Sequence, residues 1–259
     1  MISYILITGA SGGIGEQFAK ILAQRGRNLI LVSRNKDTLE KVAAPLREQY
    51  NVFIHCLDYD LSKDGTPEEL FSIVHSNMWN VEVLINNAGY GLNGLFSSHN
   101  LHEERALLQC NIEALVSLCS LFSGPMIQRR KGGILNIAST AAYTGIPYLA
   151  SYAASKAFVK NFSIALHSEL KPFGVTVTCC CPGGTATNFF HRAKVDRSTI
   201  TFPLQTPEIV AFNALQGLEQ QKALVISGWY NYVMVLLTRI LPEQFNAFVS
   251  EKIFKPKNL

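Results

Sequence analysis

Three side chains suited to proton transfer lie between positions 139 and 156. Tyr152 and Lys156 are four residues apart in the alanine-rich run SYAASKAFVKNFSIAL, so on a helix both project from one face about one turn apart. An ammonium beside a phenol favours the phenolate. We therefore expect Lys156 to lower the pKa of Tyr152 from about 10 toward the range where general acid/base catalysis is efficient. Ser139 ends an apolar run and can supply a hydrogen bond to the same place.

A Tyr-x-x-x-Lys pair also fits the surface of an ordinary helix, so the elements that position it decide its meaning. The chain begins with ISYILIT at 2–8, an apolar run typical of a strand, followed by GASGGIG and the helical pattern EQFAKILAQRG. The three glycines at 9, 13 and 15 permit a tight turn in which backbone N–H groups approach a phosphate at a helix N-terminus. This order of strand, turn and helix predicts a nucleotide-binding unit.

The glycine spacing in this turn is G-x-x-x-G-x-G, which differs from the general dinucleotide pattern G-x-G-x-x-G. The run T-G-x-x-x-G-x-G resembles the nucleotide turn of the short-chain dehydrogenase/reductase family. The resemblance covers residues 2–228 and implies cofactor contacts from Gly9, Ser11, Gly13, Ile14 and Gly15.

Alternating strand and helix patterns follow the turn and predict the fold. Further strands are expected at 28–34, 52–62, 81–89, 131–140, 174–180 and 222–228, with helices near 36–49, 66–77, 101–122 and 207–220. Strands alternating with helices indicate a parallel sheet. The sequence therefore predicts the α/β class: a Rossmann-type doubly wound parallel sheet of about seven strands with helices on both faces, in a single domain.

The end of the second strand determines the expected cofactor. NAD sites place an acidic residue there to bind the ribose 2′-hydroxyl, whereas this chain has Ser33, Arg34 and Asn35. Arginine suits a 2′-phosphate, so NADP(H) is favoured over NAD(H); the alternative is that Arg34 is only a solvated loop residue. Some NADP enzymes of the family also carry a basic residue before the second turn glycine, and Gly12 occupies that position here.

Other motifs match the family in the expected order. Asp60 and Leu61 match its adenine-contacting pair, with Asp58 as a competing candidate. The run Asn86–Gly89 reads NNAG, and through Asn87, Ala88 and Gly89 the resemblance implies a lining for the cofactor cleft.

The tetrad and the last turn complete the resemblance. Asn111, Ser139, Tyr152 and Lys156 match the family's catalytic tetrad, in which the asparagine position holds a water for the proton relay. Ser139 and Tyr152 are separated by 13 positions, the family spacing. A P-G-x-x-x-T turn is expected against the nicotinamide carboxamide and contains Pro182, Gly183, Thr185 and Thr187.

Composition limits the remaining function classes. The 259 residues, with 48% hydrophobic and 16% charged, suit one large α/β domain. The net charge of +4 is dispersed, so we expect no nucleic-acid partner. The six cysteines form no CxxC pair, so no metal site is expected and they resemble the reduced thiols of a cytoplasmic protein. We expect no secretion leader and no transmembrane span, since the longest candidate, 232–241, is too short.

The C-terminal third carries fewer signals. The polar connection 191–207 is a candidate substrate lid. We expect a catalytic domain at 1–228 and a helical extension at 229–259, with two helices broken at Pro242. The apolar face of the extension suits the core, a homodimer or homotetramer interface, a substrate-channel wall, or peripheral membrane contact.

Together these features predict an NADP(H)-dependent oxidoreductase that moves a hydride between nicotinamide and a carbonyl or secondary alcohol of a hydrophobic substrate. Tyr152 is the expected general acid/base. The main alternative is a non-catalytic nucleotide sensor or scaffold on the same fold, since fold alone does not fix function. A nucleotide-sugar epimerase or dehydratase shares Tyr-x-x-x-Lys but has a different turn spacing and a longer chain.

Overall fold

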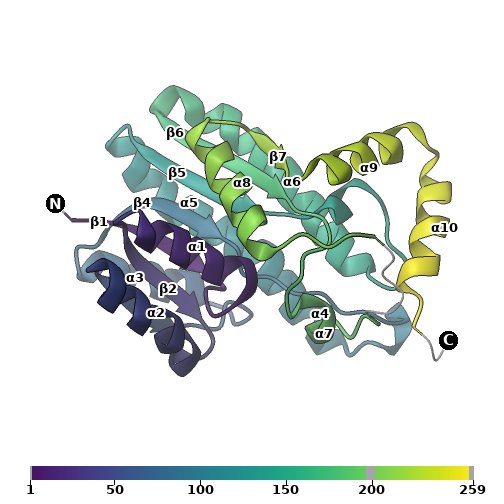
Figure 1. The fold of residues 1–259 in the computed structure, drawn as a ribbon, viewed down its shortest axis with the longest axis horizontal. Helices are drawn as coiled ribbons and strands as arrows, with labels where there is room; N and C mark the ends of the chain where they lie inside the picture. The colour runs from purple at the N-terminus through teal and green to yellow at the C-terminus, as the bar shows by residue number, and fades with distance from the viewer. Residues whose placement is uncertain (1, 197–201, 257–259) are drawn as a thin grey trace.

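Seven parallel strands form a single sheet in a computed structural model that describes residues 2–196 and 202–256 (Figure 1). The sheet order is β3-β2-β1-β4-β5-β6-β7. The strands are β1 Ser3–Thr8, β2 Asn28–Ser33, β3 Ile54–Asp58, β4 Asn80–Asn86, β5 Gly132–Ile137, β6 Val175–Cys181 and β7 Leu224–Ile226. All seven predicted strands are present, and the predicted doubly wound α/β class is confirmed.

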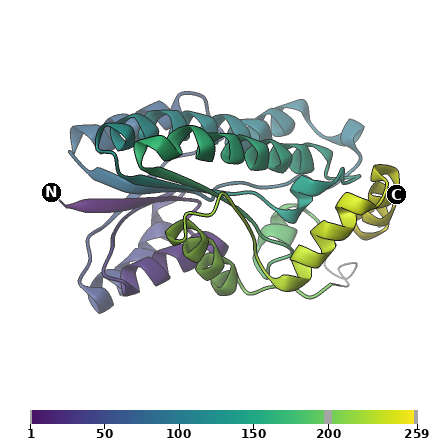
Figure 2. The same ribbon diagram turned by 90° about the horizontal axis from the view of Figure 1, so that it is seen from above.

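Helices cover both faces of the sheet (Figure 2). They are α1 Gly13–Gln24, α2 Lys36–Tyr50, α3 Thr66–Ser76, α4 Leu101–Leu108, α5 Ala114–Gln128, α6 Ala150–Leu170, α7 Phe189–Arg192, α8 Pro207–Glu219, α9 Trp229–Ile240 and α10 Glu243–Phe254. Helices α1, α2 and α8 share one core cluster, and α3, α5 and α6 share the other.

The strand side chains alternate between these two cores. In β1, Tyr4 and Leu6 pack in the core beneath α3, α5 and α6, whereas Ile5 and Ile7 pack beneath α1, α2 and α8. Successive side chains of a strand point to opposite faces, so a strand covered by helices on both sides must be apolar throughout. Full burial of one such side chain contributes about 1.5–3 kcal/mol, and this holds the sheet rigid behind its carboxyl edge.

The order of the strands changes direction between β1 and β4: β2 and β3 lie on one side of β1, and β4 to β7 lie on the other. Strand β1 pairs with β2 on one side and with β4 on the other. In open α/β sheets ligands bind outside the carboxyl ends of the strands at such a switch point. The loops that follow Thr8 and Asn86 are therefore the ones placed to bind a ligand.

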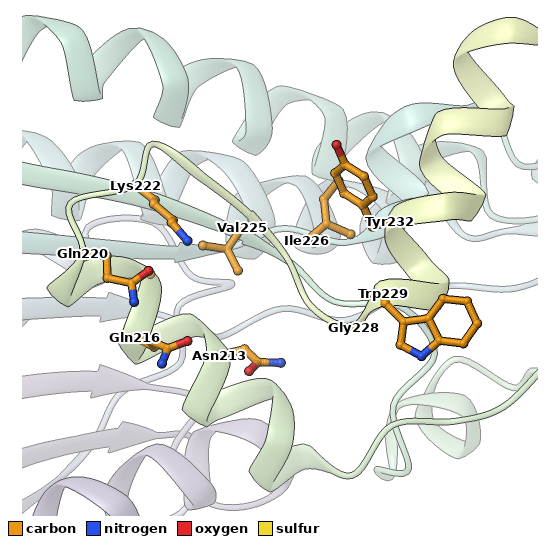
Figure 3. A pocket seen from close by; sticks show the side chains of 10 residues that line it. Asn213, Gln216, Gln220, Lys222, Val225, Ile226, Gly228, Trp229 and Tyr232 are labelled. Carbon is orange, nitrogen blue, oxygen red and sulfur yellow. The ribbon is translucent and has the colours of Figure 1, made fainter.

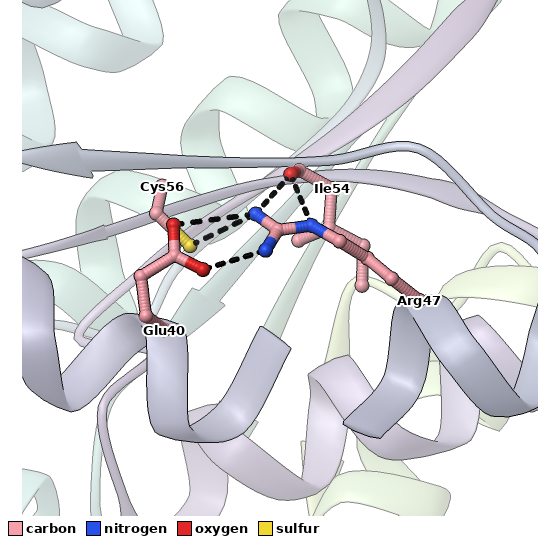
Figure 4. Close-up of polar contacts among 4 residues, drawn as sticks. All are labelled: Glu40, Arg47, Ile54 and Cys56. Carbon is pink, nitrogen blue, oxygen red and sulfur yellow. Dashed lines mark hydrogen bonds and ion pairs between the residues drawn. The ribbon is translucent and has the colours of Figure 1, made fainter. Parts of the chain in front are cut away.

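A polar cluster attaches α2 to the edge strand β3 (Figure 4). Arg47 Nε donates to the carbonyl of Ile54 at 2.9 Å, and its guanidinium pairs with Glu40 at 2.5 Å. The hydrogen bond from Arg47 lowers the pKa of Glu40. Because β3 has a neighbour on one side only, this attachment helps to hold the segment that follows it, which contains Asp60.

The segment predicted as one helix near 101–122 is longer and contains an irregular turn. Helix α4 passes into a π-helical turn, Gln109–Glu113, and then into α5, which ends at Gln128. Such turns occur inside α-helices, frequently at functional sites. The turn directs the buried side chain of Asn111 toward the loop after β4.

The same helical run corrects one expectation from the sequence. Among the described residues, the helical run Leu101–Gln128 is long and apolar enough to cross a membrane by length and composition, and an 18-residue window within it has a mean hydropathy of 1.5. The sequence reading, which found no stretch of that length, overlooked it. Leu118 and Phe122, which belong to this run, are buried in the core. Packing against the sheet explains its apolar character, and a single such helix is weak evidence for a span.

The C-terminal extension forms two helices as predicted. Helix α9 ends at Ile240 and α10 begins at Glu243, on either side of Pro242. The candidate lid at 191–207 begins within the short helix α7, and residues 197–201 of it lie outside the described residues. Its role as a lid stays a prediction.

Candidate active site

Ser139 and Tyr152 meet just beyond the carboxyl end of β5. Ser139 lies two residues after the strand, and its Oγ accepts a hydrogen bond from the backbone N–H of Ala141 at 3.1 Å. Tyr152 lies in the first turn of α6, close enough to Ser139 for the serine hydroxyl to favour the ionised form of the phenol. The fold thus brings together two residues that are 13 positions apart in the sequence.

Lys156 lies one turn further along α6 and is 5% exposed. Its Nζ donates a hydrogen bond of 2.9 Å to the carbonyl of Ile137, the last residue of β5, and lies 5.9 Å from the centroid of the Tyr152 ring. Burial lowers the pKa of Lys156, because the charged form loses its hydration. The ammonium thus ties α6 to the strand that delivers Ser139.

The electrostatics of Tyr152 differ from the expectation. Burial raises the pKa of Tyr152 to about 12, which outweighs the lowering by the hydrogen bond from Ser139. The predicted lowering by Lys156 is not met in this arrangement, because the ammonium is directed to Ile137 and is itself desolvated. At neutral pH the phenol is therefore protonated and suited to donate a proton.

Asn111 braces the site from the π-helical turn. Its Oδ1 accepts from the backbone N–H of Tyr90 at 3.1 Å, and its Nδ2 donates to the carbonyl of Tyr90 at 2.9 Å and to Oγ of Ser155 at 3.1 Å. Ser155 in turn donates to the carbonyl of Tyr152 at 2.7 Å. The amide therefore connects the loop after β4 to α6. The water-relay role expected for Asn111 stays a prediction.

Aromatic side chains cover Tyr152. Phe189 in α7 lies 5.0 Å from Tyr152 between ring centroids, and a Cβ placed on Gly91 would come within 3.4 Å of both rings. Tyr152, Phe189 and Phe254 pack against a small apolar cluster that includes Phe190 and Leu149. Tyr152 is therefore surrounded on this side by apolar side chains.

The glycine turn between β1 and α1 has a cradle shape. Gly9 and Gly13 have φ angles of 65° and 57°, a conformation that favours glycine. A Cβ on Gly15 would lie 2.2 Å from the carbonyl oxygen of Gly9, whereas a Cβ on Gly12 would meet nothing within 4 Å. Ser11 is half-buried in the turn, and the partly buried side chain of Ile14 packs on the core.

The segment after β4 fixes this turn from behind. Asn87 Nδ2 donates to the carbonyls of Thr8 and Gly9 at 3.0 and 3.1 Å. The hydroxyl of Thr8 accepts from the N–H groups of Asn87 and Ala88, each at 3.0 Å. Gly89 follows, and a Cβ there would lie 3.2 Å from Lys156 Nζ. NNAG thus joins the glycine turn to the lysine.

Arg34 and Asp60 lie at the ends of β2 and β3. Arg34 is exposed, and its positive charge is among the causes that lower the pKa of Asp60. Burial opposes that shift, but two hydrogen bonds from Ser62 to Asp60 outweigh it. Leu61 is buried in the core, so its side chain serves packing. The guanidinium of Arg34 faces solvent, and this leaves room beside it for an anionic ligand.

The Pro-Gly turn after β6 closes the far side of the site. The carbonyl of Pro182 accepts from Thr140 N–H at 2.8 Å, which links this turn to the segment after Ser139. The hydroxyl of Thr185 is committed to the carbonyl of Gly183 at 3.0 Å. A Cβ on Gly13 would lie 3.1 Å from Thr187 Cγ2, so Thr187 reaches across to the glycine turn.

Several residues that shape the site were missed by the sequence reading. Asn93 Nδ2 donates to the carbonyls of Phe254 at 2.9 Å and Tyr148 at 3.3 Å. Asn231 in α9 donates to Gln205 Oε1 at 3.0 Å and packs on Gly183. These contacts join segments distant in sequence, and isolated asparagines carry no local pattern that predicts them.

A separate open hollow of about 280 Å³ lies between α8, β7 and α9 (Figure 3). Asn213, Gln216, Lys222 and Trp229 are among its lining residues. None of the tetrad residues lines it. We therefore take the tetrad, and not this hollow, as the candidate active site.

Comparison with known proteins agrees with this geometry. The family model described as short chain dehydrogenase matches residues 3–198. The chain belongs to the short-chain dehydrogenase family. A very-long-chain 3-oxoacyl-CoA reductase-like protein of Arabidopsis thaliana is 35% identical over 81% of this chain and 68% of its own length. A very-long-chain 3-oxoacyl-CoA reductase of Phaeosphaeria nodorum is 38% identical over 68% of this chain. The chain spans about half (53%) of that relative's length.

Solved structures of short-chain dehydrogenases share the fold. The enzyme from Sphingobium yanoikuyae in complex with NADPH has a TM-score of 0.84 and 29% identity, over 92% of this chain and 94% of that chain. A bulky-bulky ketone specific alcohol dehydrogenase from Comamonas testosteroni has a TM-score of 0.78 and 28% identity, over 92% of each chain. The family and its fold establish the chain as an oxidoreductase with a nicotinamide cofactor.

Proposed function

We propose that this short-chain dehydrogenase is an NADP(H)-dependent reductase of 3-oxoacyl thioesters that carry apolar acyl chains. The observation that carries the proposal is the placement of Ser139 and Tyr152 side by side beyond the carboxyl end of β5, with the buried ammonium of Lys156 one turn behind. Relatives named 3-oxoacyl-CoA reductases support the substrate class. Arg34 and a relative structure in complex with NADPH support the cofactor.

The glycine turn fits a dinucleotide phosphate. The surface at Gly12 is open, and the first turn of α1 directs its unpaired N–H groups toward the same place. Arg34 is exposed at the end of β2, where a guanidinium can bind a 2′-phosphate through two parallel hydrogen bonds. Asp60 and the NNAG segment provide the walls next to it.

The protein's own contribution is to manage the proton. When bound, the cofactor supplies a hydride to the carbonyl carbon. Tyr152, protonated because its pKa is raised to about 12, donates its phenolic proton to the carbonyl oxygen, which becomes the hydroxyl of the product. Ser139 donates a hydrogen bond to the same oxygen as negative charge develops on it. Lys156 holds α6, and with it Tyr152, against the end of β5 through its hydrogen bond to the carbonyl of Ile137.

The apolar surroundings of Tyr152 support a hydrophobic substrate. Phe189, Phe190 and Leu204 pack beside Tyr152 together with Phe254 from the end of α10. Burial of each methylene of an acyl chain contributes about 0.8 kcal/mol. Affinity is therefore expected to increase with the length of the acyl chain.

The proposal is tested by oxidation of NADPH and NADH in the presence of 3-oxoacyl thioesters of increasing chain length. We expect turnover with NADPH, and a loss on the order of 10²–10⁴-fold in Tyr152→Phe with unchanged NADPH binding. Tyr50→Phe, at the last residue of α2 and outside the tetrad, is the matched control. Activity with NADH alone would refute the cofactor assignment. Tight NADPH binding without turnover on any carbonyl would assign a nucleotide-sensing function instead.

A further inference from the structure

The two C-terminal helices present a concentrated apolar surface to solvent. We define the C-terminal arm as α9 and α10, residues 229–254. Of the twenty-four large apolar side chains that are exposed among the described residues, twelve lie on this arm between residues 229 and 249. Trp229 is 79% exposed and Ile240 is 80% exposed. Both views show the arm projecting from the end of the molecule where the strands end (Figures 1 and 2).

The apolar surface of α9 is too wide for packing on one flat partner. Asn231 and Val235 are its buried residues, and at about 100° per residue they occupy one narrow side of the helix. The exposed apolar positions extend over more than half of the circumference. In order around the helix axis they run from Tyr232 through Leu236 and Ile240 to Met234. A helix that faces a protein core shows a stripe only a little over about 100° wide, whereas lipid can surround a helix on all its open sides.

We propose that the C-terminal arm docks the protein onto an anionic lipid surface, with α9 and α10 lying in the interface. A helix of 12 residues is about 18 Å long, too short for a hydrocarbon core of about 30 Å, so the arm inserts without spanning. Trp229, Tyr230 and Tyr232 begin α9, and such amphipathic rings favour the membrane interface. The arm carries two cations, Arg239 and Lys252, against two acids, Glu243 and Glu251, and Lys255 directly after its last residue leaves this part of the chain with one excess positive charge.

Three side-chain hydrogen bonds hold the arm in a fixed position on the protein. Asn231 donates to the carbonyl of Ser227 at 2.7 Å where α9 begins, and Asn246 donates to the carbonyl of Thr238 at 2.8 Å between the two helices. Asn93 binds the carbonyl of Phe254 at 2.9 Å where α10 ends. Docking therefore costs little conformational entropy, and it orients the carboxyl edge of the sheet toward the lipid.

The proposal is tested by flotation of the full chain with vesicles of phosphatidylcholine, with and without phosphatidylglycerol. We expect the protein to float with the vesicles, more strongly with phosphatidylglycerol. The double variant Leu237→Ser/Ile240→Ser should lower the bound fraction roughly tenfold or more, because two exposed apolar side chains no longer insert. Phe53→Ser/Met78→Ser removes two exposed apolar side chains far from the arm and should bind as the unaltered chain does.

A second measurement uses tryptophan fluorescence. The chain has two tryptophans, and Trp79 stacks on His55 at 3.9 Å whereas Trp229 is exposed on the arm. Vesicles should shift the emission to shorter wavelength in the unaltered chain, and Trp229→Phe should abolish the shift. Neither measurement needs cofactor or substrate, so its failure leaves the proposed reductase activity untouched.

Absence of vesicle binding at both compositions would overturn the proposal. In that case light scattering identifies the competing occupant. A mass of two copies that falls to one copy in Leu237→Ser/Ile240→Ser would assign the arm to a homodimer interface instead.

Discussion

The side-chain amide of Asn111 donates a hydrogen bond of 3.1 Å to the hydroxyl of Ser155, which itself donates to the carbonyl of Tyr152 at 2.7 Å. This chain of bonds passes from the π-helical turn to Tyr152, the proposed acid/base residue. Asn111 also binds both backbone groups of Tyr90. The residue is therefore a structural brace of the site, in addition to any part in proton transfer.

Asn111→Ala should destabilise the fold as well as the reaction. The substitution leaves the partly buried N–H and carbonyl of Tyr90 without their partner, which costs about 1–3 kcal/mol of the free energy of unfolding. Urea denaturation followed by circular dichroism measures this loss. Asn188→Ala, at an exposed position, is the control and should stay within about 0.5 kcal/mol of the unaltered chain. Unchanged stability in Asn111→Ala would limit the residue to a relay.

Substitution by alanine should have very different effects on nucleotide affinity at two glycines of the same turn. Gly15→Ala places a Cβ 2.2 Å from the carbonyl oxygen of Gly9, so the turn must open and nucleotide affinity should fall at least roughly tenfold. A Cβ on Gly12 meets no protein atom within 4 Å, so Gly12→Ala should keep the shape of the turn and lose much less affinity than Gly15→Ala does. Isothermal titration with NADPH compares the two variants. Equal losses in both would show that the cradle shape does not govern binding.

Much of this site was predictable because its motifs are local. The glycine turn, NNAG and Tyr-x-x-x-Lys each lie within a few residues, and their order fixes their place on the sheet. The pKa of Tyr152 was not predictable, since it depends on burial by Phe189 and on the direction of the Lys156 ammonium, both products of tertiary packing. The contact between Asn93 and Phe254 spans 161 positions and has no sequence signature.

The fold shows the same limit. Strand positions followed from apolar runs, and the break at Pro242 followed from proline chemistry. The π-helical turn at Asn111 did not, because residues 101–122 have one continuous helical pattern.

Arg34→Ser should shift cofactor preference. Loss of charge-assisted hydrogen bonds to a 2′-phosphate removes about 1.5–3 kcal/mol, so KM for NADPH should rise roughly 10–100-fold while KM for NADH changes little. Lys41→Ser removes the same charge from an exposed position on α2 and is the matched control. Steady-state kinetics with both cofactors provides the measurement. An equal rise of KM for NADPH and for NADH would show that Arg34 acts only through the long-range effect of its positive charge and not by binding the 2′-phosphate.

The pH dependence should differ between the two directions of the reaction. Burial raises the pKa of Tyr152 to about 12, so between pH 6 and 9 the phenol is protonated, which is the form that donates a proton in reduction. The reduction rate should therefore be nearly independent of pH in this window. Oxidation needs the tyrosinate, whose small population rises about tenfold for each pH unit below the pKa, so its rate should rise with a logarithmic slope near one. Measuring kcat in both directions with saturating cofactor checks the pair of slopes. A reduction rate that falls with a midpoint near pH 7 would mean that Lys156 does lower the pKa of Tyr152 during turnover.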